Sequence, residues 1–288
     1  MNNDFLQKFI FEHIPVRGCL VRLAQSWLEV RLRARPDADA TELLGQAICA
    51  SAVLGSSIKF EGTVSLQLQT SGSLRFLLGQ CSHEHKVRGI ARKNSAAKGG
   101  LDLMIDPVLS INLEPESGGA SYQGIVSMND GSLARALELY FEQSEQLETR
   151  LWLAVNDQSC AAFMLQRMPG EHLDQDDFVR LSHLAATMTD QELHHTVPEQ
   201  LLHLLFNEDT VRLFDAQEVQ FGCKCSQQRV AGVLQSLGKS EMESLLQEQG
   251  RVEVNCEYCG KDYLFDHVDI ASLFSDPAVT IKGSAELH

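Results

Sequence analysis

Four cysteines near the carboxyl end of the chain constrain its fold more than any other feature. They form two closely spaced pairs, Cys223 with Cys225 and Cys256 with Cys259, and 30 residues separate the pairs. Two such pairs flanking one folded segment supply four thiolates to a tetrahedral zinc ion. Gly260 follows the second pair, where the turn around a metal usually requires a positive φ. The spacing therefore predicts one closed Cys₄ zinc site per chain.

Two other interpretations of these thiols remain open on spacing alone. In an oxidising compartment they can form disulfides, but no signal peptide opens the sequence, and half of the eight cysteines lie outside the cluster. They can also be four ordinary buried thiols. The other cysteines lie in apolar or strand-edge contexts and are expected to be buried without a redox role: Cys19, Cys49, Cys81 and Cys160.

The zinc ion is expected to be structural. The segment that carries the cysteines, residues 221–274, is only about fifty residues long, which is near the size where a hydrophobic core alone stops being sufficient. Removal of the metal should therefore unfold it. Because oxidants attack thiolates, the same site can couple oxidation to unfolding, although most Cys₄ zinc sites are purely structural.

Composition and charge narrow the class of protein. The chain has 288 residues, a hydrophobic content of 44% and a formal net charge of −15. No apolar run reaches the length needed to span a bilayer, so we expect a soluble, cytoplasmic protein with no membrane partner. Residues 221–288 hold six Lys and Arg against ten Asp and Glu, which disfavours a nucleic-acid partner.

Enzyme classes fit the motifs poorly. Four thiolates leave no open position for catalytic zinc, and the sequence has neither a P-loop nor a dinucleotide-binding fingerprint. A dithiol oxidoreductase is harder to exclude, because the Cys-x-x-Cys spacing of the second pair alone fits redox exchange. A zinc ribbon that binds another protein is the other alternative. We expect a protein that is not an enzyme.

Hydrophobic periodicity predicts an α+β fold with three parts. Residues 1–172 should form an α/β sandwich-like domain, built from hairpins around a buried helix that begins near Asp39 and is apolar nearly all round. Strands are expected at 16–23, 64–78 and 150–166, whereas residues 1–15 give mixed signals. Residues 221–288 should form the small zinc-binding domain, with a helix over 240–249 and a frayed tail from Asp276.

Residues 173–220 are predicted to be a helical linker of marginal stability. Capping boxes begin at Thr189 and Thr196, and the helices are too short to be stable alone. Their apolar faces therefore need a partner, and the linker should be docked on the domains at either side. The linker apolar stripe consists of Leu201, Leu202, Leu204 and Leu205.

Histidines offer weaker candidates for metal ligands. His83 lies near His85, and His194 is next to His195, but neither has a second pair at ligand spacing. Surface or loop positions are expected for these four. His267 follows the cysteine cluster closely, yet four sulfurs already complete a tetrahedron.

With these elements in place, the chain resembles the heat shock protein 33 family over almost its whole length. The most specific matches are Phe221-Gly222-Cys223-Lys224-Cys225-Ser226 and the run from Cys256 to Phe265. Weaker matches follow in order, among them Val16-Arg17-Gly18, Arg88-Gly89-Ile90-Ala91-Arg92 and Tyr140-Phe141-Glu142-Gln143-Ser144-Glu145-Gln146.

The resemblance implies a redox-regulated, ATP-independent holdase of the bacterial cytosol. It implies that the reduced protein holds zinc through all four thiolates and is inactive. It also implies that oxidation forms the disulfides Cys223–Cys225 and Cys256–Cys259, expels zinc and unfolds the linker. Apolar surface then becomes available to unfolding client proteins, and the active form is expected to be a homodimer.

Overall fold

The structure is a computed structural model, and it describes residues 4–34, 36, 38–58, 61–94, 102–128, 131–169 and 175–274. The chain divides into two compact units, Met1–Cys223 and Lys224–His288. The tail expected from Asp276 lies outside the described residues. Among the helices described, none combines the length and the apolar character needed to cross a membrane.

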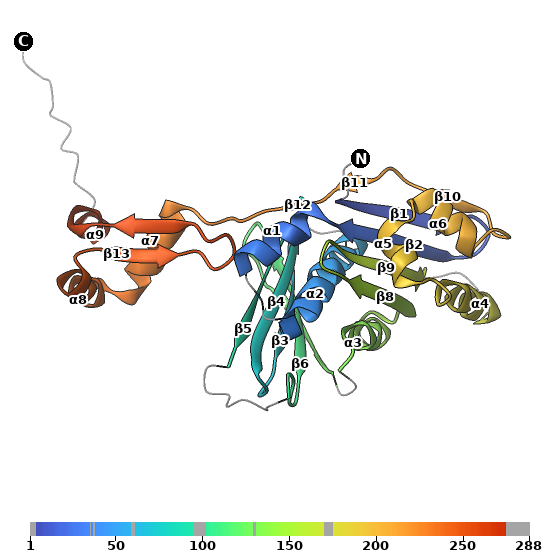
Figure 1. Cartoon of the computed structure of the whole chain (residues 1–288), viewed down its shortest axis with the longest axis horizontal. Coiled ribbons are helices and arrows are strands. Elements are labelled where there is room, and N and C mark those ends of the chain that lie inside the picture. Colours follow the sequence, from blue (N-terminus) through green and yellow to red (C-terminus); the bar gives the residue numbers. More distant parts are fainter. Residues whose placement is uncertain are drawn as a thin grey trace, which may run out of the picture. The chain divides into compact units, whose positions relative to one another are not determined.

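The N-terminal unit contains two six-stranded sheets (Figure 1). The first sheet has the order β10-β1-β2-β9-β8, and β11 also pairs with β1. All of its strand pairs are antiparallel. Its strands are β1 (Phe5–Phe11), β2 (Val16–Leu23), β8 (Thr149–Val155), β9 (Cys160–Arg167), β10 (Val211–Leu213) and β11 (Gln217–Glu218).

The second sheet has the order β12-β5-β4-β3-β6-β7 and is antiparallel except where β12 runs parallel to β5. Its strands are β3 (Gly62–Gln69), β4 (Leu74–Ser82), β5 (Lys86–Lys93), β6 (Val108–Pro115), β7 (Tyr122–Ser127) and β12 (Gln220–Phe221). The hairpins expected at 64–78 and 150–166 are both present.

The helix α2 (Ala38–Ser57) lies between the two sheets and contacts strands of both (Figure 1). Its residues from Ala47 to Leu54 are all buried, with Ser51 as the one polar member, which confirms the buried helix. The backbone of α2 lies so close to β4 that a residue without a side chain is required there. A Cβ on Gly79 of β4 would lie 2.6 Å from the backbone of Ala47. The fold is therefore α+β, as expected.

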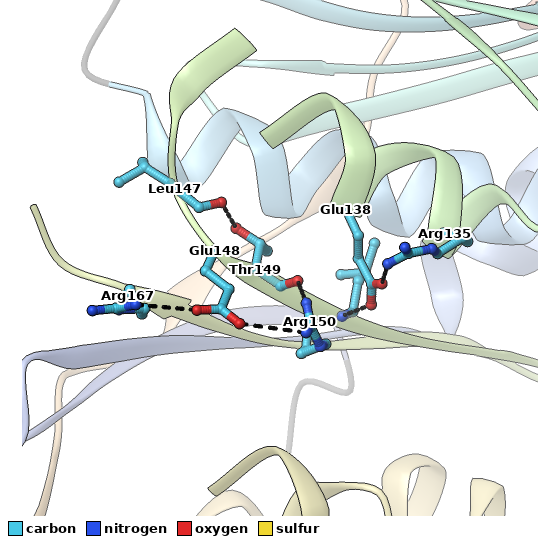
Figure 2. A network of polar contacts seen from close by, with 8 residues as sticks. Arg135, Glu138, Leu147, Glu148, Thr149, Arg150 and Arg167 are labelled. Atoms are coloured by element: carbon cyan, nitrogen blue, oxygen red, sulfur yellow. Dashed lines mark hydrogen bonds and ion pairs between the residues drawn. The ribbon is translucent and has the colours of Figure 1, made fainter. Parts of the chain in front are cut away.

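Before the linker, the other described helices are α1 (Gln25–Ala34) and α3 (Leu133–Tyr140). The helix α3 continues into one π-helical turn, Phe141–Glu145. Polar contacts attach α3 to the hairpin β8–β9 (Figure 2). The Glu138 carboxylate accepts a hydrogen bond from the Leu151 backbone N–H at 3.0 Å, and Glu148 contacts Arg150 and Arg167 at 3.4 and 3.2 Å. These contacts fix the edge of the first sheet that lies opposite β10.

The C-terminal unit is small. Its elements are α7 (Gln227–Leu237), α8 (Lys239–Gln249), β13 (Val252–Asn255), β14 (Asp262–Phe265) and α9 (His267–Leu273). The helix expected over 240–249 is α8, whereas α7 and α9 were not anticipated. The buried core of its described part has seven residues: Leu234, Met242, Leu246, Val252, Tyr263, Phe265 and Ile270. A core of this size favours dependence on a metal.

The linker contains α4 (Gln175–Ala185), α5 (Asp190–His195) and α6 (Pro198–Leu205). Thr189 forms the expected capping box with Glu192, whereas the box expected at Thr196 is absent, because Val197 is the N-cap of α6 and makes no side-chain cap hydrogen bond. The helical part ends at Leu205; among the following residues, 206–222, a turn over 207–209 precedes the short strands β10, β11 and β12. We call residues 206–222 the return segment.

Candidate metal centre

The structure brings the side chains of the four cysteines together. Their Sγ atoms all lie within 4.8 Å of one another, and Cys225 Sγ lies 3.3 Å from Cys259 Sγ. Sulfurs bound to one tetrahedral zinc lie roughly 3.8 Å apart, whereas a disulfide requires about 2.05 Å. The four cysteines form no disulfide and are half-buried, so their arrangement fits a shared metal ion. We call Cys223, Cys225, Cys256 and Cys259 the thiol cluster.

The turn between β13 and β14 positions the second cysteine pair. The Gly260 backbone N–H donates to Cys256 O at 2.7 Å, and the Cys256 N–H donates to Lys261 O at 2.9 Å. Gly260 has a φ of +67°, as the sequence predicted, and a side chain there would be strained. Because Cys256 and Cys259 lie in a hairpin turn and not at the start of a helix, the setting differs from that of a thioredoxin-like dithiol.

The first pair precedes α7. Ser226 caps this helix by accepting a hydrogen bond from the Arg229 backbone N–H at 3.2 Å. Cys225 packs against the small core, and the buried Tyr263 ring lies beside it. The neighbouring Cys225 sulfur, followed by burial, raises the pKa of the Tyr263 phenol, which therefore stays protonated. Bound to one zinc ion, four sulfurs would complete a tetrahedral shell and leave no position for a catalytic water.

The other sequence candidates do not join this site. Among the described residues, the thiol cluster is the one group of three or more Cys, His, Asp or Glu side chains placed to hold a metal. The remaining cysteines are buried, as predicted: Cys19, Cys49, Cys81 and Cys160. Burial raises the pKa of Cys19 to about 11 and that of Cys81 to about 12, which keeps both as unreactive thiols.

The histidine pairs have other roles in the structure. His83 Nδ1 lies 3.5 Å from a Glu116 carboxylate oxygen, and His85 occupies the turn after β4 with a φ of +57°. His194 is buried and not at the surface as expected, since its ring meets Ser159 beneath α5. His267 begins α9.

The linker helices cover the outer face of the first sheet (Figure 1). We call the sheet side of this contact the aromatic face; it comprises Phe9, Phe11, Val16, Leu20, Ala154, Ala161, Phe163 and Leu165. Phe9 stacks on Phe163 with ring centroids 5.4 Å apart, and Phe11 meets Phe206 edge to face at 5.0 Å. An apolar surface of this kind is kept from solvent only while the linker remains docked.

The linker apolar stripe is only partly buried. Leu201, Leu202 and Leu205 pack on the aromatic face, whereas Leu204 is 56% exposed. In a helix, positions 201, 202 and 205 share one side, and position 204 lies at about 60° from the nearest of them toward solvent, at 100° per residue. The sequence pattern could not distinguish the edge of the stripe from its centre.

Polar contacts also dock α5. The buried Arg22 guanidinium donates to Leu193 O at 2.6 Å and to Thr196 O at 2.8 Å, which satisfies carbonyls at the end of the helix. His194 Nδ1 lies 2.8 Å from Ser159 Oγ. Release of α5 would leave Arg22 without these acceptors.

The neutral form of His194 favours docking. Burial lowers the pKa of His194, and the neighbouring His195 and Arg22 lower it further, whereas Asp190 opposes them. Since the pKa in the docked state lies below the ordinary 6.5, protonation favours the released state. The stabilisation by His194 is complete above about pH 6.5 and declines as the pH falls through that value.

We therefore expect the amides of α5 in the reduced protein to lose hydrogen-exchange protection between about pH 7 and pH 5, after correction for intrinsic exchange rates. His194→Asn keeps an acceptor near Ser159 but does not titrate, so it should flatten this dependence. Equal pH dependence in the two proteins would contradict the assignment to His194.

The return segment connects the linker helices to the first cysteine pair. Arg180 binds Asp209 through two hydrogen bonds of 2.7 and 2.9 Å, and Val219 is fully buried in the main core. The Gly222 N–H donates to Val87 O at 3.0 Å, and Cys223 follows directly. These strands were not predicted because each contains only two or three residues, too few for a period-two pattern.

Comparisons with known proteins agree with this architecture. A model of the Hsp33 protein family matches residues 4–266. The 33 kDa chaperonin of Nitrosococcus oceani is 41% identical over 277 residues, which cover 96% of both chains. The 33 kDa chaperonin of Shewanella denitrificans is 40% identical, covering 97% of this chain and 98% of its own. The crystal structure of the 33 kDa chaperonin from Thermotoga maritima superposes with a TM-score of 0.79 at 22% identity, covering 94% of this chain and 97% of that chain.

Proposed function

The chain belongs to the Hsp33 family, whose curated members are named chaperonins and not enzymes, and from this we propose that it is a redox-regulated, ATP-independent holdase. It prevents aggregation of unfolding proteins during oxidative stress. The reduced form is inactive, and oxidation of the thiol cluster activates it. Two observations carry this proposal: four cysteine thiols converge to within reach of one metal ion, and the linker covers an aromatic face of the N-terminal unit.

In the reduced form, Cys223, Cys225, Cys256 and Cys259 hold one Zn²⁺ per chain. Bound there, zinc would keep the four sulfurs deprotonated and supply the stability that the small core lacks. The hairpin turn at Gly260 and the cap at Ser226 orient the two pairs. Thiolates are the forms that oxidants attack.

Activation oxidises two dithiols to two disulfides, and each oxidation is coupled to the reduction of one peroxide. One peroxide accepts two electrons from Cys223 and Cys225, whose sulfurs form one disulfide, and a second peroxide does the same with Cys256 and Cys259. Both peroxides are reduced to water or hydroxide. This pairing rests on the likeness to the family. Sulfurs held in disulfides no longer provide thiolate ligands, so the metal is lost and the C-terminal unit unfolds.

The linker, residues 173–220, then loses its order. Its helices have 11, 6 and 8 residues, lengths at which isolated helices are marginal. The return segment leads directly into Cys223, so unfolding beyond that residue removes the restraint on its carboxyl end. The aromatic face becomes accessible to clients, which are unfolded or partly unfolded proteins. The active protein is a homodimer in the cytoplasm, with no nucleic acid or membrane partner.

The test compares reduced, zinc-loaded protein with protein oxidised by hydrogen peroxide at mild heat or by hypochlorous acid. Light scattering of a heat-unfolding reporter enzyme, without ATP, should be suppressed only by the oxidised form. Peptide mapping should find Cys223–Cys225 and Cys256–Cys259, with about one zinc released per chain. Equal suppression by reduced protein that retains all its zinc would exclude the proposal. Turnover of a disulfide substrate would instead indicate a dithiol oxidoreductase.

A further inference from the structure

We propose that oxidised protein binds clients by β-strand addition, with an extended client segment pairing with the edge of β1 that the return segment occupies here. The inference rests on the proposed function, because this edge becomes free only when the linker is released. It adds a binding mode to the apolar contact: backbone hydrogen bonds would contribute affinity that does not depend on any particular client side chain.

The return segment already shows that this edge accepts an extended chain. Glu12 N–H donates to Thr210 O at 3.0 Å, and Lys8 O accepts from Phe214 N–H at 2.9 Å. Ile10 lies opposite Arg212 between these bonds. By the alternation of an antiparallel ladder, the backbone groups of residues 8, 10 and 12 face the edge, while the intervening residues bond to β2.

The return segment pairs with only part of the β1 edge. Five of the seven residues of β1 have a partner in β10 or β11, and Gln7 and Lys8 lie at the break between them. There the Gln7 side-chain amide donates to Phe214 O at 2.8 Å in place of a regular ladder bond. A continuous client strand can pair along the whole of β1. Once the linker is undocked, such a strand competes well with the return segment.

The edge also selects a side-chain pattern. Val211 and Leu213 are half-buried against the aromatic face, whereas Arg212 between them is exposed. The fitting occupant is therefore an extended polypeptide with apolar side chains at alternate positions. Unfolding proteins expose such strand-forming segments, and these segments are prone to aggregate.

The experiment uses full-length oxidised protein and a nine-residue peptide of alternating leucine and threonine, in two N-methylated isomers. Methyl groups on the threonine amides project toward β1, because the polar positions correspond to Arg212, and they block the ladder. Methyl groups on the leucine amides project away. We expect the leucine-methylated peptide to bind nearly as well as the unmodified one. The threonine-methylated peptide should bind at least about tenfold more weakly, since several backbone hydrogen bonds are lost.

Hydrogen exchange of individual amides locates the peptide. In oxidised protein, the amides of Ile10 and Glu12 should exchange rapidly and regain protection when the leucine-methylated peptide is added. Equal binding of both isomers, or a bound peptide with no protection at Ile10 and Glu12, would overturn the inference and leave the proposed function intact. Protection that grows with protein concentration without peptide would assign the edge to a second copy and also overturn it. If oxidised protein keeps residues 210–219 protected and does not suppress aggregation, the proposed function itself fails.

Discussion

Replacing Cys256 by serine is expected to remove the metal and unfold the C-terminal unit while the N-terminal unit stays folded. Zinc binding worth about 10–16 kcal/mol in small domains is shared by four ligands, so losing one thiolate should weaken affinity roughly 10²- to 10³-fold. The small core of the unit cannot compensate. Metal analysis of the purified reduced protein should fall from one zinc per chain to a small fraction, and amides of residues 227–273 should lose protection.

Cys81→Ala is the matched control for this variant. Cys81 is also a reduced cysteine, but it is buried in the N-terminal unit outside the thiol cluster. Its variant should keep one zinc per chain and a protected C-terminal unit. If Cys256→Ser retained full zinc and normal protection, the thiol cluster would not be the metal site.

Replacing Leu201 by aspartate is expected to activate the reduced protein without removing its zinc. Leu201 is 1% exposed and packs on the aromatic face through α6. A carboxylate at this position would be buried without a partner, at a cost of several kcal/mol, and the marginal helix can avoid that cost by undocking. Reduced Leu201→Asp should therefore suppress light scattering, while its zinc content remains one per chain.

Leu204→Asp is the control in the same helix. Leu204 is largely exposed, and a surface substitution of this kind changes stability by only about 0.5 kcal/mol. It should leave the reduced protein inactive. Equal activity of the two reduced variants would show that added charge, and not undocking, is responsible. An inactive Leu201→Asp protein with an undocked linker would show that linker release is not sufficient.

The parts of the fold that were predictable are those whose residues give a local signal. The helix α2 is apolar nearly all round because two sheets cover it, and the hairpin β3–β4 alternates because one of its faces meets that helix. The thiol cluster was predictable from the spacing of its cysteines, because metal ligation restricts the residue types that can occupy these positions. The strand β1 was not recognised, because Leu6 enters one core and Phe9 the other, which removes the alternation of a half-buried strand.

Other features depend on partners distant in the sequence. Arg22 caps α5 from 171 residues away in the sequence. The strand β11 pairs with β1, although the two lie near opposite ends of the sequence of the N-terminal unit. The exposure of Leu204 likewise depends on how α6 is rotated against the sheet. Short helices and strands of two or three residues are specified by such docking contacts and not by their own sequence.

The account is tested most directly by following zinc release and hydrogen-exchange protection of residues 190–213 in the same oxidation time course. A chromogenic chelator reports the metal, and mass spectrometry reports α5, α6 and β10. We predict that protection is lost together with the zinc, no earlier than its release, and that both are restored by reduction in the presence of zinc. Complete zinc release with residues 190–213 still fully protected would contradict the coupling of the metal site to the linker.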